Sequence, residues 1–227
     1  LKNISFELSQ GEHLSLMGES GCGKSTLLKV IYGLVDVQEG SVHFHNERVW
    51  GPSHQLVPGF KTMKYLAQDF GLGPYHTVAE NVGKFISNLD LNYKKERVME
   101  LLTLVGMERF APLKALNLSG GEKQLVLIAR AIAQQAKLLI MDEPTASLDF
   151  GNQIRVLEKI KQLQHQNIAL LITTHNPQQA AYLAENIAML DQEFGFQQGE
   201  KSELMTLENL AKIYRTSVQE LQKHLNI

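Results

Sequence analysis

The chain has 227 residues, 44% of them hydrophobic, and its 22 basic and 24 acidic side chains nearly cancel. This length can bury a full core in one or two subdomains, and the charge balance argues against nucleic acid or a membrane surface as a dominant partner. A single cysteine excludes an intrachain disulfide, and no apolar run approaches the roughly 20 residues that span a bilayer. We therefore expect a globular cytoplasmic protein that does not bind nucleic acid.

The first predicted unit is a strand over 12–18, a glycine-rich turn, and a helix over 24–33 that ends on a capping glycine. The turn, GESGCGKST, fits the phosphate-loop pattern G-x-x-x-x-G-K-[ST], in which backbone N–H groups wrap phosphates. In that pattern Lys24 neutralises charge on the outer phosphates, and the Ser25 hydroxyl ligates Mg²⁺. The alternative is a glycine turn that only caps the helix. The candidate nucleotide-binding residues here are Gly18, Glu19, Ser20, Gly21, Cys22, Gly23, Lys24, Ser25 and Thr26.

The middle of the chain changes from strand to helix. Residues 62–68 predict a short strand that ends at Gln68, and 77–86 and 94–106 then have the apolar spacing of helices. A further helix begins near Ser119 and runs for about fourteen residues. We expect these helices to form a subdomain at about 71–135 that is inserted into an α/β core.

Two uninterrupted apolar strands, at 137–144 and 167–175, follow with a helix over 152–164 between them. This arrangement predicts a parallel sheet that is covered on both faces. The strand at 167–175 leads into a further helix, with Asn176 as N-cap and Pro177 as first residue. The expected α/β core therefore comprises about 1–70 and 136–200, and a helical tail of about 201–227 packs on it through Leu207, Leu210, Ile213 and Tyr214.

Polar side chains follow several of the predicted strands. Asp142 and Glu143 end one strand, His175 ends another, and Gln68 ends a third. Because ligands of parallel α/β sheets lie outside the carboxyl ends of the strands, these residues can converge on the phosphate loop. There Asp142 would hold Mg²⁺, Glu143 would activate water as general base, Gln68 would bind Mg²⁺ and water, and His175 would contact the γ-phosphate. Each alone also fits a solvated loop or an ordinary strand-end residue.

The segment LSGGEKQ, residues 118–124, opens the helix that begins near Ser119. A capping box between Ser119 and Glu122 accounts for two of its residues but not for Gly120 and Gly121. Glycine lets a ligand approach the unsatisfied N–H groups of a helix start, which favour anions. Since the chain has one phosphate loop, the anion would belong to a second copy packed head to tail.

Together these motifs resemble the ATP-binding subunits of ABC transporters over nearly the whole chain: the phosphate loop, the Q-loop Gln68, the signature LSGGEKQ, the Walker B acids, the D-loop SLD and the switch His175. The resemblance implies a RecA-like P-loop NTPase core with an inserted helical subdomain, and a dimer, expected to be a homodimer, that sandwiches two ATP with Mg²⁺. It also implies that Asp149 lies near the dimer seam. Transmembrane permease subunits would dock in a groove by Gln68, which places the chain on the inner face of the cell membrane.

Two positions depart from the family pattern. The adenine-stacking aromatic residue of the family lies upstream of Leu1, and the position after the signature glutamine, usually basic, is Leu125.

The ending LMTLENLAKIYRTSVQEL resembles the C-terminal pattern of subunits that serve importers of iron siderophores, haem, cobalamin or molybdate. The main alternative is a non-transport ABC ATPase, such as one similar to the iron–sulfur cluster assembly factor or to chromosome and repair proteins. A plain P-loop switch or kinase would leave the signature glycines unexplained.

Overall fold

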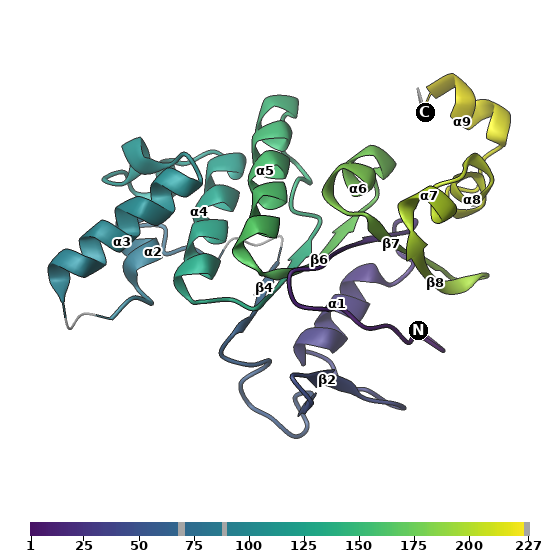
Figure 1. Ribbon diagram of the computed structural model, residues 1–227, viewed down its shortest axis with the longest axis horizontal. Helices are drawn as coiled ribbons and strands as arrows, with labels where there is room; N and C mark the ends of the chain where they lie inside the picture. Colours follow the sequence, from purple (N-terminus) through teal and green to yellow (C-terminus); the bar gives the residue numbers. More distant parts are fainter. Residues whose placement is uncertain (68–70, 88–89, 225–227) are drawn as a thin grey trace.

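The protein is described by a computed structural model that covers residues 1–67, 71–87 and 90–224 (Figure 1). Gln68 lies outside the described residues, so its expected role remains a prediction. The main sheet has six strands in the order β4-β5-β6-β1-β7-β8, all parallel except β8, which pairs antiparallel with β7. The predicted α/β fold with a mostly parallel sheet is therefore confirmed. The strands are β1 His13–Met17, β4 Met63–Leu66, β5 Leu138–Asp142, β6 Ala169–Thr174, β7 Asn186–Asp191 and β8 Gly195–Glu200.

The helices lie on both faces of this sheet, with α1 on one side and α5 and α6 on the other (Figure 1). They are α1 Lys24–Tyr32, α2 Val78–Gly83, α3 Leu91–Leu104, α4 Gly120–Ala133, α5 Phe150–Gln162, α6 Pro177–Leu183, α7 Lys201–Leu204, α8 Leu207–Ile213 and α9 Val218–His224, with 3₁₀ turns at Glu108–Phe110, Ala115–Asn117 and Leu163–Gln166.

Strand β5 shows why both faces are buried. Leu139 and Met141 belong to the hydrophobic cluster that contains α4 and α5, whereas Leu138 and Ile140 belong to the cluster under α1. Successive side chains of a strand point to opposite faces, so a strand that is buried on both sides needs a continuous apolar run. This packing explains why the sequences of β5 and β6 are continuous apolar runs.

Several short strands were absent from the sequence prediction. The hairpin of β2 Val42–Phe44 and β3 Glu47–Val49 forms a separate two-stranded sheet. β7 follows α6 after only two residues. β8 is largely polar because it is the outermost strand and, among the described residues, pairs with β7 alone. The predicted helix over 77–86 is shorter than expected: Thr77 caps it through a capping box, and it ends at Gly83.

The helices α2, α3 and α4 share one hydrophobic cluster with α5 and one face of the sheet. Within the described residues, no helix is both long and apolar enough to cross a bilayer.

Candidate functional site

The phosphate-loop motif forms the turn between β1 and α1. A Cβ atom on Gly18 would lie 2.3 Å from the backbone oxygen of Leu190, so only glycine fits this close approach to β7. Gly21 and Gly23 have φ angles of +84° and +109°, which side chains rarely adopt. The glycines thus set the path of a loop that delivers Lys24 to the first position of α1.

The Lys24 ammonium is enclosed by this loop, with 5% of the residue exposed. It donates hydrogen bonds to the backbone oxygens of Gly18 at 2.9 Å and Glu19 at 3.0 Å. A carboxylate oxygen of Glu143 lies 4.0 Å away. A buried cation is costly unless it is paired and hydrogen-bonded, and these contacts hold the charge inside the loop.

Asp142, at the end of β5, is the centre of a buried hydrogen-bond network. Its Oδ1 accepts from the Ser25 hydroxyl at 3.0 Å and from the Thr173 hydroxyl at 2.7 Å. Its Oδ2 accepts from the Tyr65 hydroxyl at 3.2 Å. Burial and the neighbouring Asp142 charge raise the pKa of Tyr65, which keeps its hydroxyl a donor. Side chains of β4, β6 and α1 therefore fix one carboxylate at the end of β5.

Glu143 adopts an unusual left-handed backbone with φ +47°. Its N–H donates to the Thr173 hydroxyl at 2.9 Å, which anchors this conformation. One carboxylate oxygen lies 3.2 Å from Nδ1 of His175, an exposed residue directly after β6. Strained backbone at a strand end is common where a side chain must be aimed at a ligand.

The structure thus brings Lys24, Ser25, Asp142, Glu143 and His175 together at one edge of the sheet. Sequence reasoning missed Tyr65 and Thr173, which contact the acids from neighbouring strands. A polar residue at the end of the apolar run of β6 was an available signal for Thr173. Tyr65 had none, because only strand pairing places β4 beside β5.

Ser25 and Asp142 fit a magnesium site by donor chemistry. Mg²⁺ prefers oxygen ligands and is usually held by one or two protein groups together with substrate phosphates. A hydroxyl and a carboxylate 3.0 Å apart beside the phosphate loop are such a pair. In the described part of the chain, no cluster of three or more His, Cys, Asp or Glu side chains that could hold a metal occurs.

The segment LSGGEKQ begins α4 as a complete capping box: Ser119 accepts from the N–H of Glu122, whose carboxylate accepts from the N–H of Ser119. Gly121 has a local explanation, since a Cβ there would lie 2.7 Å from the Asn152 side chain of α5. Asp149 caps α5 and also bonds Asn152, which places the D-loop and the signature next to each other. Packing against α5 therefore calls for glycine at position 121 whether or not an anion binds there.

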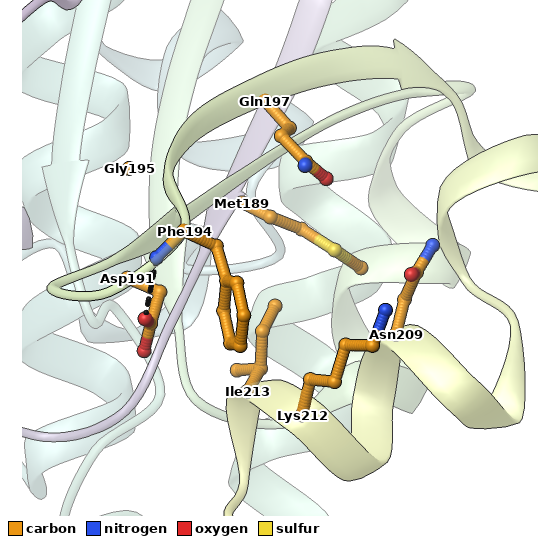
Figure 2. Close-up of a pocket in the computed structure, with 8 residues that line it drawn as sticks. All are labelled: Met189, Asp191, Phe194, Gly195, Gln197, Asn209, Lys212 and Ile213. Atoms are coloured by element: carbon orange, nitrogen blue, oxygen red, sulfur yellow. Dashed lines mark hydrogen bonds between the residues drawn. The ribbon is translucent and has the colours of Figure 1, made fainter.

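An open pocket of about 830 Å³ adjoins the phosphate loop. Its walls are the N-terminal residues 1–3, the loop residues Cys22, Gly23 and Thr26, and the turn between β7 and β8. A neighbouring pocket between that turn and α8 holds only about 50 Å³, room for water but not for a nucleotide (Figure 2).

A family model described as ABC transporter matches residues 1–146. An uncharacterized ABC transporter ATP-binding protein of Haemophilus influenzae is 50% identical over the whole chain and 88% of its own length. The spermidine/putrescine import ATP-binding protein PotA of Thermotoga maritima is 34% identical over 85% of the chain, which spans only about half (52%) of that relative.

Two solved structures are also similar. One, an inward-facing ABC transporter described as metal-chelate type, has a TM-score of 0.76 and 29% identity, and the match covers 93% of this chain and 82% of that one. The other, a dimeric ATP-binding cassette bound to ADP and Pi, has a TM-score of 0.73 and 30% identity, covering 88% and 90%.

Proposed function

Because the chain belongs to the ABC transporter family as an ATP-binding subunit that hydrolyses ATP, we propose that it powers solute import through membrane-embedded partner subunits. The observation that carries this proposal is the convergence of Lys24, Ser25, Asp142, Glu143 and His175 at one edge of the sheet. Such a site can bind and hydrolyse a nucleoside triphosphate. The family supplies the link to transport.

The residues of the phosphate loop, 18–26, hold the phosphates of ATP through their N–H groups, and Lys24 neutralises the outer ones. The ribose and base extend into the adjoining pocket of about 830 Å³. Ser25 and Asp142 hold Mg²⁺, with Gln68, outside the described residues, as a further ligand. The bound ion neutralises charge that develops on the phosphates.

Glu143 acts as the general base that orients and polarises water. A general base must lie within hydrogen-bond reach of the proton that it removes, and Glu143 is aimed into the site by its left-handed backbone. His175, 3.2 Å from the Glu143 carboxylate, holds that side chain and contacts the γ-phosphate.

Hydrolysis in this proposal needs two copies of the chain. Ser119, Gly120 and Gly121 contact the nucleotide bound to the partner subunit, and Asp149 lies at the seam. Ser119 and Asp149 are exposed, and the adjacent Phe150 is 78% exposed, so this face is accessible. A similar cassette was solved as a dimer, which supports the pairing of two copies.

The membrane-embedded partners would dock near Gln68 on the helical subdomain, residues 71–135, while 1–70 and 136–200 form the RecA-like core. The chain would then lie on the cytoplasmic face of the membrane. Import is supported by the name of the PotA relative and by the C-terminal resemblance to importer subunits.

Dimerisation is tested first with Glu143→Gln, which should bind ATP without hydrolysing it. We expect an ATP-dependent dimer on a sizing column. Glu158→Gln, an acid on α5, is the matched control and should dimerise only transiently because it still hydrolyses ATP. A monomeric Glu143→Gln profile with ATP bound would contradict the sandwich.

Transport is tested by affinity capture of the same Glu143→Gln protein from detergent-solubilised membranes of its own organism. Recovery of a polytopic membrane protein, identified by mass spectrometry, is expected. Recovery of soluble assembly partners alone would instead favour the non-transport ATPase.

A further inference from the structure

The C-terminal tail, residues 201–224, is anchored directly behind the phosphate loop. Leu210 and Ile213 of α8 are 0% and 4% exposed and pack in one cluster with Met17 and Met189. Met17 is the last residue of β1 and immediately precedes the loop. Ile213 and Lys212 line one small pocket together with Phe194 of the turn between β7 and β8 (Figure 2). The end of α8 is thus fixed relative to the site.

The helix ends with an arginine in a position that favours glycine. The N–H of Thr216 donates to the oxygen of Ala211, and the N–H of Arg215 donates to that of Lys212, a Schellman arrangement. Arg215 has φ +49°, although glycine usually occupies this left-handed position. A side chain is disfavoured in this conformation, so a contact made by the Arg215 side chain is the natural explanation.

Arg215 and its neighbour Tyr214 contact the two loops of the site. Nε of Arg215 lies 3.1 Å from the carboxylate of Glu19, the second residue of the phosphate loop. The Tyr214 hydroxyl donates to the backbone oxygen of His175 at 2.7 Å. Burial raises the pKa of Tyr214, so this hydroxyl stays a donor.

These contacts have different electrostatic consequences. Glu19 carries a negative charge on a loop that binds negative phosphates, and like charges raise the cost of binding. Arg215 compensates that charge. Tyr214 instead restrains the backbone of His175, whose ring lies 3.2 Å from Glu143.

We propose that Tyr214 and Arg215 are positioning residues for ATP hydrolysis, with Arg215 setting ATP affinity through Glu19 and Tyr214 setting turnover through the His175 loop. This inference rests on the proposed roles of the phosphate loop and His175. The sequence predicts only packing for the tail. In this proposal the tail also acts on the phosphate loop, through Glu19, and on the loop that carries His175.

Arg215 is tested by steady-state hydrolysis with Arg215→Gln, Glu19→Gln and the double variant. Arg215→Gln should raise KM for ATP about two- to fivefold with kcat unchanged, an effect that weakens in 0.5 M salt and that Arg215→Lys partly restores. Glu19→Gln should abolish the effect of Arg215→Gln. An unchanged KM, or an equal rise in both Glu19 backgrounds, would overturn the assignment, because loss of packing alone predicts the latter.

Tyr214 is tested with Tyr214→Phe, which removes one hydroxyl and keeps the ring. We expect kcat to fall about three- to tenfold with KM unchanged, whereas Tyr182→Phe on α6, the matched control, keeps wild-type kcat. Wild-type kcat in Tyr214→Phe would overturn the role. Glu143→Gln in the same assay separates the two levels, since hydrolysis that survives it contradicts the proposed site itself.

Discussion

The sheet edge that carries the phosphate loop and the tail that lies behind it are held by different kinds of interaction. At the edge, Asp142 is 6% exposed and accepts three hydrogen bonds from side chains on separate elements. The tail reaches the same loops through one hydroxyl and one ion pair, whose Arg215 and Glu19 side chains are 55% and 41% exposed.

The contacts of the two regions should therefore differ in how much free energy is lost when they are broken. Exposed ion pairs contribute about 0–1 kcal/mol, whereas breaking a buried network leaves charged groups without partners and costs several times more. The edge should therefore decide whether hydrolysis occurs, and the tail should adjust its rate and affinity.

The largest effect is expected at the edge, from Glu143→Gln. Loss of a general base lowers rates by about 10²- to 10⁴-fold, while ATP binding should persist because the phosphate loop is intact. Phosphate release and equilibrium ATP binding measure the two quantities separately. Comparable losses from Glu143→Gln and Tyr214→Phe would erase the distinction between edge and tail.

The next largest effect is expected from His13, at the opposite end of the strands, and it concerns folding stability and not turnover. His13, the first residue of β1, is 4% exposed, and burial lowers its pKa from 6.5 to about 4. Between these values the unfolded state binds a proton that the folded state does not, so stability falls as pH drops from 6.5 towards 4. The loss from this group is about 3 kcal/mol.

Urea unfolding of the wild type and of His13→Leu between pH 7.5 and 4 measures how much unfolding free energy is lost as His13 takes up a proton. The wild type should lose about 3 kcal/mol more than the variant over that range. Parallel pH profiles would show that His13 does not couple folding to protons.

The sequence predicts those site residues whose evidence lies within one short segment of the chain. The phosphate loop, Asp142, Glu143 and His175 are found because strand ends and glycine turns are local in sequence. Tyr65 and Thr173 were missed because their contacts with Asp142 depend on which strands become neighbours. The tail was assigned to packing because Leu210 and Ile213 repeat at helical spacing. The sequence does not show that Tyr214 contacts His175, 39 residues earlier. Nor does it show that Arg215 contacts Glu19, in a loop almost 200 residues earlier.

A smaller effect tests whether Thr173 belongs to the edge as firmly as the acids do. Thr173→Val keeps the shape but removes the hydroxyl that donates to Asp142 and accepts from the N–H of Glu143. We expect about 1–3 kcal/mol lower stability and about tenfold lower kcat. Thr174→Val is the matched control, since that hydroxyl accepts from the N–H of Asn176 and donates to Gln179, and contacts neither acid. Equal loss of kcat in both variants would contradict a specific role for Thr173.

The smallest effect concerns the start of α4, where two explanations of a glycine compete. If Gly121 is required by packing, Gly121→Ala should lower stability by about 1 kcal/mol without nucleotide, since the clash with Asn152 exceeds the helix propensity gained. Asn152→Gly in the same chain should then recover part of that loss, because it removes the atoms that a new Cβ would meet. Thermal unfolding without ATP measures both. If stability is unchanged while hydrolysis is lost, close approach of a ligand explains this glycine after all, and the packing against α5 is incidental.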